Sequence, residues 1–409
     1  MSQIIINSIL FYVTSPNKNF KLRWDSKSLD HLFKYLTKAD FQMTRKNILW
    51  LIIFALGSIF EVEPIKAETT VLNKSKNTTK IAQKAVQNES MRNLHSPRAH
   101  KNRLGRNLTS QEPVDDSNIR VTLLGTGGGP GGGGPNMITK KMNANTLVEA
   151  GGQQFLFDAG RGAMLRLASL GPRHIVRTDK VFLTHLHSDH IVDLSDLFLN
   201  GSGRGSRSIF FVWGPPGTRA MTEYLLKAYD WDLEYRANPR RPKLKMTGKD
   251  VSEGVIFEQA GVKITAFAVD HWPPRKTKQE RATFPANGYR LDYNGRSVVI
   301  SGDTRPTKNM IKFASGVDLL IHEVHVGLDG TKRDSGGRPL RGAHHTSPHE
   351  AGEIFAKARP KLAVYTHIIW GQKTEKDLID LTRDKYKGPL VVGKEMMKIK
   401  ISNSVEVLK

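Results

Sequence analysis

Cysteine is absent from this chain of 409 residues. Disulfide bonds, thiolate ligands and cysteine nucleophiles are therefore excluded. Long apolar runs are scarce: the run at residues 48–60 has thirteen residues, which is short for a membrane span but suits a secretory signal. The glycine-rich stretch after residue 124 is not followed by Gly-Lys-Ser/Thr, so it is not a phosphate-binding P-loop. We find no internal repeat.

Negative charge is scarce relative to positive charge. The chain has 62 Lys and Arg against 39 Asp and Glu, a net charge of +23, and residues 119–409 keep +15 of it. These residues should therefore attract anions. Nucleic acid, anionic polymers and small phosphate or sulfate esters all fit, and charge alone does not separate them. A solvated basic surface without a ligand accounts for the charge equally well.

Residues 43–67 have the layout of a secretory signal. Arg45 and Lys46 precede the apolar run, and a polar exit ends at residue 67. We therefore expect residues 1–67 to be an N-terminal extension with a signal-like segment, and the protein to be exported to the periplasm or beyond. A start at Met43 fits this expectation. The alternative is a cytoplasmic protein, or one in which residues 1–42 precede an uncleaved membrane anchor.

Two further segments follow. Residues 68–118 are rich in Asn, Ser, Lys and Gln and show no sustained apolar period, which predicts a disordered polar linker. Residues 119–409 have the composition of a globular domain, for which we expect no stable insertion into a membrane.

In residues 119–409, apolar runs alternate with helical stretches in two halves. Strands are predicted at residues 119–124, 145–149, 154–157, 181–183, 209–212, 262–268, 297–300, 318–321 and 362–365. Helices are predicted at residues 162–170, 218–229 and 349–358. This order predicts an α/β fold in which two mixed sheets pack face to face with helices outside.

A cluster of metal-ligating side chains follows the apolar run at residues 181–183. His185, His187, Asp189 and His190 fall within six residues, where a predicted strand gives way to a loop. Neutral imidazoles and a carboxylate are ligands that zinc prefers. The spacing H-x-H-x-D-H therefore predicts a metal site, with zinc as the expected ion and other divalent transition metals as possible substitutes.

Three further polar residues stand where predicted strands end. They are His271, Asp303 and His367. A scaffold presents chemistry at such positions, because the side chains there are free of the core. Four ligands on one loop cannot complete a site for two metals, so we expect these three to supply the rest.

These motifs together resemble the metallo-β-lactamase fold superfamily, in its branch of ribonuclease Z-like and arylsulfatase-like hydrolases. The resemblance covers about residues 119–400 and implies an αββα sandwich. Beside H-x-H-x-D-H, the motifs that carry it are Leu-Gly-Thr-Gly at 124–127, Phe-Asp-Ala-Gly at 157–160, Ser-Gly-Asp-Thr-Arg-Pro at 301–306, Ile-His-Glu at 321–323, His-His-Thr at 344–346 and Tyr-Thr-His at 365–367.

The resemblance also implies roles for the ligands. One zinc would be held by His185, His187 and His271. The other would be held by Asp189, His190 and His367. Asp303 would bridge the two ions, which share a hydroxide that is nucleophilic at neutral pH.

Further residues take catalytic or supporting roles by the same resemblance. Asp189 would also orient the nucleophile or take its proton. His345 would assist the leaving oxygen, with its neighbour His344 as the alternative, and Glu323 would orient that histidine. Asp158 is expected to support the loop rather than bind metal.

Two features bear on the substrate. Ribonuclease Z enzymes insert a long tRNA-gripping arm between the ligands that match His271 and Asp303, whereas 31 residues separate them here. Residues 186–236 are similar to the arylsulfatase-like group. Thr218 is a candidate cap of a helix whose N-terminus would accept a sulfate or phosphate oxygen, and an ordinary helix start without a ligand fits the same turn equally well. Trp272 and the basic residues 275–278 would form one wall of a small pocket.

We therefore expect a dinuclear zinc hydrolase that cleaves a small anionic ester, either a sulfate monoester or a phosphate ester. The first alternative is a tRNA 3′-end endoribonuclease, which would bind nucleic acid and require a cytoplasmic location. The second is a non-catalytic anion binder stabilised by zinc. The resemblance also allows a homodimer.

Overall fold

A computed structural model of the chain describes residues 117–129, 141–202, 209–237, 243–272, 284–328 and 342–408. All of them belong to the second of the two units into which the chain divides, Ser110–Lys409. The predicted N-terminal extension, its signal-like segment and residues 68–116 of the predicted linker lie outside the described residues. In the part of the chain that is described, no helix has both the length and the apolar character needed to cross a membrane.

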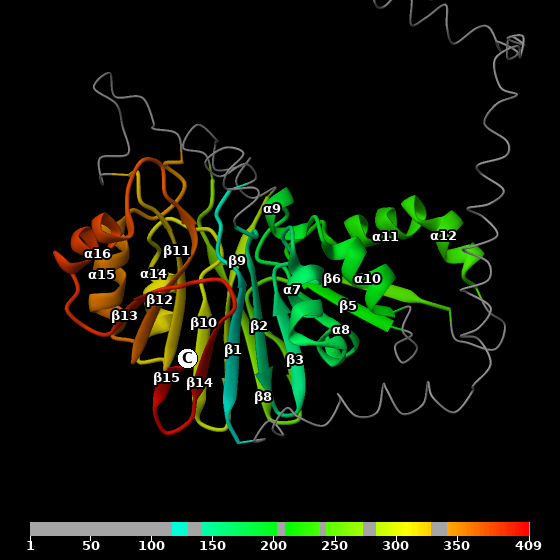
Figure 1. Ribbon diagram of the computed structural model, residues 1–409, viewed down its shortest axis with the longest axis horizontal. Helices are drawn as coiled ribbons and strands as arrows, with labels where there is room; N and C mark the ends of the chain where they lie inside the picture. The colour runs from blue at the N-terminus through cyan, green and yellow to red at the C-terminus, as the bar shows by residue number, and fades with distance from the viewer. Residues whose placement is uncertain are drawn as a thin grey trace, which may run out of the picture. The chain divides into compact units, whose positions relative to one another are not determined.

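Two mixed β-sheets form the centre of this unit (Figure 1). The first sheet has the spatial order β15 (Val405–Leu408), β14 (Met397–Ile401), β1 (Ile119–Gly125), β2 (Asn145–Ala150), β3 (Gln153–Phe157), β4 (Lys180–Phe182), β5 (Ile209–Gly214) and β6 (Lys245–Asp250). It is antiparallel from β15 to β3 and parallel from β3 to β6.

The second sheet has the spatial order β13 (Leu390–Val392), β12 (Leu362–Ile369), β11 (Leu319–His325), β10 (Arg296–Ile300), β9 (Ala286–Tyr293), β8 (Val262–Val269) and β7 (Gly254–Gln259). It is antiparallel from β7 to β10 and parallel from β10 to β13. In each sheet the carboxyl ends of the parallel strands lie on the same side of the sheet. Loops at this end can present side chains to a ligand.

Helices cover the outer face of each sheet (Figure 1). The first sheet is covered by α7 (Ala163–Leu170), α8 (Pro172–Arg177), α10 (Leu194–Ser202) and α11 (Thr218–Ala228), which leads into α12 (Asp230–Tyr235). The second sheet is covered by α14 (Lys308–Ala314), α15 (Pro348–Ala358) and α16 (Glu375–Arg383). A single helical turn, α9 (Ser188–Ile191), lies at the upper end of the sheets in Figure 1.

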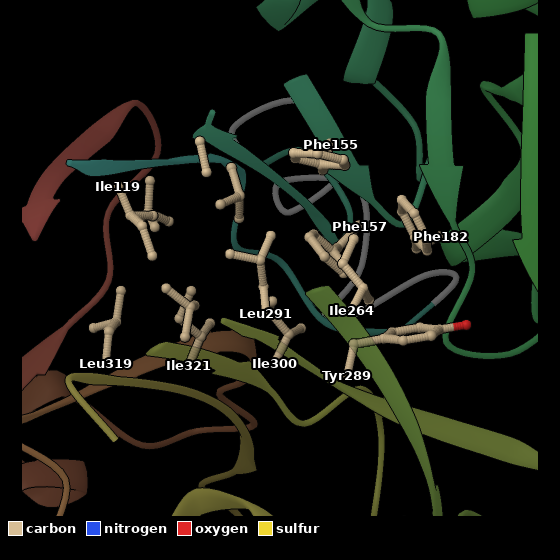
Figure 2. Packing of buried hydrophobic residues seen from close by; sticks show 14 of the residues in the cluster. Ile119, Phe155, Phe157, Phe182, Ile264, Tyr289, Leu291, Ile300, Leu319 and Ile321 are labelled. Atoms are coloured by element: carbon tan, nitrogen blue, oxygen red, sulfur yellow. The ribbon is translucent and has the colours of Figure 1, made fainter. Parts of the chain in front are cut away.

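Three apolar layers hold these elements together. The central layer lies between the sheets, where Phe155 and Phe182 of the first sheet face Ile264 and Tyr289 of the second (Figure 2). The Phe182 ring stacks on that of Trp213 with centroids 4.8 Å apart. The two outer layers lie between each sheet and its helices. Burial of these aromatic and branched side chains is the main stabilising contribution to the fold.

The predicted αββα sandwich is therefore confirmed. Each predicted strand and helix is present, with ends within four residues of those observed. The hairpin of β2 and β3 turns at Gly151 and Gly152, whose φ angles of 55° and 66° suit glycine in a two-residue turn. The prediction for Thr218 is wrong. The cap residue of α11 is Gly217, and the Thr218 hydroxyl instead donates to the Pro215 carbonyl at 2.7 Å.

Candidate metal centre

The seven predicted ligands come together at the carboxyl ends of the strands. The loop after β4 carries His185 and His187, and α9 carries Asp189 and His190. The second sheet supplies the other three: His271 follows β8, Asp303 follows β10, and His367 lies in β12. These residues form overlapping groups whose ligating atoms lie within 4.8 Å of one another. The ligands thus come from both sheets.

The first group consists of His185, His187 and His271. Nδ1 of His187 lies 2.9 Å from Nε2 of His185 and 3.2 Å from Nε2 of His271. The other ring nitrogen of His271, Nδ1, is 3.3 Å from the carbonyl oxygen of His344, which can only accept, so Nδ1 carries a proton and Nε2 a lone pair. His185 and His271 are buried, whereas His187 is exposed and marks the open side of the group.

The second group consists of Asp189, His190 and His367. Oδ2 of Asp189 lies 3.2 Å from Nε2 of His367 and 3.6 Å from Nε2 of His190. Nδ1 of His190 donates to Asp158 at 2.8 Å, so Nε2 faces its two partners. A carboxylate on the far ring nitrogen is the usual support of a metal-binding histidine. Asp158, which we expected from the sequence to support the loop, is thus placed against the far ring nitrogen of His190.

Asp303 lies between the two groups. Its Oδ2 is 3.9 Å from Nε2 of His185 and 3.6 Å from Nε2 of His271. Its Oδ1 is 3.4 Å from Nε2 of His190 and 3.3 Å from Nδ1 of His367. One oxygen therefore faces each group, which is the position required of a bridging carboxylate.

The donor set fits a divalent cation. Nε2 of His190, Oδ1 of Asp303 and Nδ1 of His367 are buried, and none makes a hydrogen bond within the described part of the chain. Buried polar atoms without a partner are rare and costly. Because these atoms converge on one another, a cation among them would satisfy all three. Imidazole and carboxylate donors are those of zinc sites.

The local electrostatics favour the metal-binding form of most of the seven ligands. Burial lowers the pKa of the His185 and His271 imidazoles well below the ordinary value. Burial opposes ionisation of Asp303, but the charges of His367 and His190 hold its pKa well below the usual range. Burial also opposes ionisation of Asp189, yet its hydrogen bond with His367 lowers the pKa to about 2. Ionised carboxylates and neutral imidazoles are the forms that bind metal.

Backbone geometry brings the second group close to the glycine-rich strand end. A Cβ added to Gly128 would lie 2.7 Å from the carbonyl oxygen of His367 and 2.9 Å from its Nδ1. No larger residue fits there, as expected of a glycine beside the metal site. The φ angle of His367 is itself 44°, a left-handed conformation that a non-glycine residue rarely adopts. Residues 130–140, with the remaining glycines, lie outside the described residues.

The structure separates the two adjacent histidines. Nδ1 of His345 is 3.2 Å from Oε2 of Glu323 and 3.9 Å from Oδ2 of Asp303. Burial opposes a charge on His345, but the carboxylate of Glu323 raises its pKa. His344 is half-buried and its ring packs against those of His271 and His345. His345, rather than His344, therefore faces the carboxylates.

Glu323 also fixes the two turns beside it. Its Oε1 accepts the backbone N–H groups of Thr304 at 3.1 Å and Thr346 at 3.0 Å, the residues that follow Asp303 and His345. The turn after His345 is further fixed by a capping box at the start of α15, in which Ser347 and Glu350 bond to each other's backbone N–H. This side of the site is thus held by hydrogen bonds to the main chain.

Two other residues lie near the site, one of them predicted from the sequence. Trp272 directly follows His271, and its ring lies 5.6 Å from that of the exposed Phe284. The basic residues 275–278 of the predicted pocket wall lie outside the described residues. Thr184, to which we assigned no role from the sequence, lies beneath both ligand groups and bonds to Asp158.

Comparison with known proteins identifies similar chains. The model of the beta-lactamase superfamily domain matches residues 153–368. Ribonuclease Z of Mycolicibacterium gilvum is 30% identical over 305 residues, which cover 98% of that protein and 70% of this chain. Ribonuclease Z of Mycobacterium marinum is 31% identical over 295 residues, which cover 99% of that protein and 69% of this chain.

Solved structures give the same fold. The metallo-β-lactamase fold protein YhfI from Bacillus subtilis matches with a TM-score of 0.51 at 20% identity, covering 99% of its chain and 69% of this one. The short form of human tRNase Z matches with a TM-score of 0.50 at 21% identity, covering the same shares. At these identities the likeness concerns the fold alone.

Proposed function

Because the chain belongs to the ribonuclease Z-like branch of the metallo-β-lactamase superfamily, and is thus a metal-dependent hydrolase, we propose that it is an endoribonuclease acting on the 3′ ends of tRNA precursors. The observation that carries this proposal is the match to ribonuclease Z over 98% of that protein's length. The small anionic ester that ranked first from the sequence has no such support. The main argument for a small ester was that the 31 residues between His271 and Asp303 leave no room for a tRNA-gripping arm. That argument concerns a single insertion and not the rest of the domain.

We propose that His185, His187, Asp189, His190, His271, Asp303 and His367 hold two divalent cations, with zinc the best match to these donors. When bound, such ions supply Lewis-acid activation of water and stabilise negative charge on the phosphate. The protein's own contribution is the fixed direction of the donor atoms, set by burial and by the hydrogen bonds of the far ring nitrogens.

In this proposal Asp189 accepts a proton and His345 donates one. Asp189 is ionised at neutral pH and can accept a proton from the attacking water. His345 holds a proton more firmly than an ordinary histidine because Glu323 lies 3.2 Å from its Nδ1. It can therefore protonate the leaving 3′ oxygen of the RNA. The positive balance of residues 119–409 favours approach of a polyanion.

A substrate panel tests the proposal. The full-length, zinc-replete protein is offered a tRNA precursor with a 3′ trailer, an unstructured RNA of the same length, a bis-aryl phosphate and an aryl sulfate. We expect a single cut at the 3′ end of the tRNA and slow turnover of the aryl phosphate. Efficient hydrolysis of the aryl sulfate with the precursor left intact would support a small-ester hydrolase and refute the proposed endoribonuclease activity.

One variant separates the hydrolase from a non-catalytic anion binder. Asp189→Ala should lower the rate of RNA cleavage by orders of magnitude while RNA binding persists. Asp179→Ala is the matched control, because Asp179 pairs with Lys180 at 2.9 Å and takes no part in the ligand groups. A cleavage rate that tolerates Asp189→Ala would favour the binder.

Cellular location follows from the same proposal. A domain that processes tRNA must meet it in the cytoplasm, so we propose a cytoplasmic or membrane-anchored protein over an exported one. Residues 43–67, which favour export, lie outside the described residues. Reporter fusions to residue 409, one active only in the cytoplasm and one only after export, decide between the locations. Activity of the exported reporter alone would contradict our choice.

A further inference from the structure

The hydroxyl of Thr184 lies close to one ligand of each group, His185 and His190. Thr184 directly precedes His185, its side chain is fully buried, and its backbone carbonyl accepts the N–H of Asn287 at 2.8 Å. Its backbone N–H donates to Oδ1 of Asp158 at 2.7 Å. Asp158 directly follows β3 and has a φ angle of 61°, and it lies 26 residues before Thr184 in the chain.

The hydroxyl of Thr184 has one proton and several neighbours. Oγ1 lies 2.9 Å from Oδ2 of Asp158, 3.1 Å from Nδ1 of His185 and 3.5 Å from Nδ1 of His190. A carboxylate is the strongest acceptor among these, so the hydroxyl proton points to Asp158. The hydroxyl oxygen is then left as an acceptor, and Nδ1 of His185 must supply the proton between them.

This assignment fixes a lone pair in each ligand group. With a proton on Nδ1, His185 presents the lone pair of Nε2 to His187 and His271. Nδ1 of His190 donates to Oδ2 of Asp158, the same oxygen that accepts from Thr184, so Nε2 of His190 faces the second group. Two hydrogen-bonded residues thus direct one ligand of each cation.

The methyl group of Thr184 packs close to Gly302, in the turn that carries the bridging residue Asp303. A Cβ added to Gly302 would lie 2.7 Å from Cβ and 3.0 Å from Cγ2 of Thr184. Gly302 has a φ angle of 59° and directly precedes Asp303. The Thr184 side chain therefore supports the bridging residue by packing and His185 by a direct hydrogen bond, and it supports His190 through Asp158.

We propose that Thr184, acting with Asp158, is a positioning residue that sets the affinity of both cation sites at once. The inference rests on the two-cation site of the proposed function, but not on the identity of the substrate. Loss of the hydroxyl leaves Nδ1 of His185 without its acceptor and Asp158 with one donor fewer. Both sites should weaken together, because the same hydroxyl accepts from His185 in one group and donates to Asp158, which holds His190 in the other.

Metal binding to the full-length protein tests this. Zinc affinity and stoichiometry are measured by competition with a chromophoric chelator for the wild type, Thr184→Val and Thr184→Ser. Valine keeps the shape and removes the hydroxyl, so we expect both sites to weaken by about 10- to 100-fold, the usual effect of removing such a support. Serine keeps the hydroxyl and loses only the methyl group that packs near Gly302, so we expect it to weaken zinc binding much less than valine does.

Two controls separate positioning from simple stability. Thr222→Val removes a buried hydroxyl that donates to Arg219 within α11, away from the site, and should leave zinc affinity unchanged. The second readout is the ring protonation of His185 and His190, measured by imidazole ¹⁵N NMR with zinc bound. Thr184→Val should weaken the Nδ1–H signal of His185, which a merely structural role would not affect.

A further variant covers the case in which Thr184→Val does not fold. Asp158→Asn keeps the size and the left-handed backbone, which asparagine tolerates, but replaces one acceptor oxygen with a donor. We expect it to weaken zinc binding at least as strongly as Thr184→Val does in the folded protein. Wild-type affinity at both sites in Thr184→Val or Asp158→Asn overturns the inference and leaves the proposed ribonuclease activity standing. Fewer than two zinc ions on the wild type overturn both.

Discussion

Replacement of Glu323 by glutamine should slow the chemical step and shift its pH dependence. Glu323 is buried, and its Oε2 lies 3.2 Å from Nδ1 of His345. Glutamine keeps the shape and keeps an oxygen for the backbone N–H groups of Thr304 and Thr346. The variant thus removes the negative charge next to His345 and changes little else.

The size of the effect follows from that charge. At an effective dielectric constant near 20, two charges about 4 Å apart attract by about 4 kcal/mol, and burial offsets part of this. A net loss of roughly 1.4–2.8 kcal/mol corresponds to about 10- to 100-fold in rate. His345→Gln removes the proton donor altogether and should cost about 10²- to 10⁴-fold. The double variant should be no slower than His345→Gln, because both act through one proton.

The sign of the pH shift is fixed by the pKa of His345. Glu323 raises it, so Glu323→Gln lowers it, and the protonated fraction of His345 falls at neutral pH. The alkaline limb of the rate profile should therefore move to lower pH. The assay is single-turnover cleavage of a tRNA precursor between pH 5 and 9. Glu353→Gln, on the exposed face of α15, is the control. An unchanged rate and profile in Glu323→Gln would show that His345 needs no carboxylate.

Three further outcomes are expected of the metal site. Zinc binding to the metal-free protein near pH 7 should release a proton. Burial opposes a charge on His190, but Asp303 and Asp158 raise its pKa well above the ordinary value, and a cation displaces the proton; calorimetry in buffers of different ionisation enthalpy measures the release. Metal-free protein should lose roughly 2 kcal/mol of stability as the pH falls from about 4 to 2, since the pKa of Asp189 is lowered to about 2, and Asp189→Asn should remove this loss in acid-denaturation curves. Chelation should lower the melting temperature by about 5 °C or more per site, because a ligand at 100 times its Kd contributes about 2.7 kcal/mol; an unchanged melting curve would mean that no cation was bound.

Local patterns in the sequence are sufficient for the central strands. The run 181–183 and its counterparts are apolar because both faces of these strands are covered, one by the other sheet and one by helices. Strands at the edge of a sheet, or next to it, cannot be predicted in this way. In the edge strand β7 each residue is exposed or half-buried, and β14, beside the edge strand β15, pairs with β1, which lies near the start of the described residues. Neither exposure nor distant pairing can be read from a local window of residues.

The candidate ligands could be predicted for a similar reason, and Asp158 and Glu323 could be predicted from the family resemblance, whereas Thr184 could not. A histidine or aspartate that interrupts an apolar run is conspicuous wherever it occurs. Thr184 is not, because threonine is common at the end of a strand. Its role appears only when Asp158, 26 residues earlier, is seen to share its proton. The choice of His345 over His344 likewise depends on which ring the turn directs toward Glu323, and adjacent residues give no local signal for that.

The division of the ligands between the two sheets links metal binding to the packing of the fold. Each group takes two residues from the loop and turn after β4 and one from the second sheet: His271 in the first group and His367 in the second. A bound cation therefore joins the sheets at their carboxyl edge, while Phe182, Trp213 and their neighbours join them in the middle. Loosening either contact should loosen the other. Metal affinity should therefore fall in a core variant such as Phe182→Ala even though it touches no ligand, because the cations require the two sheets at a fixed separation.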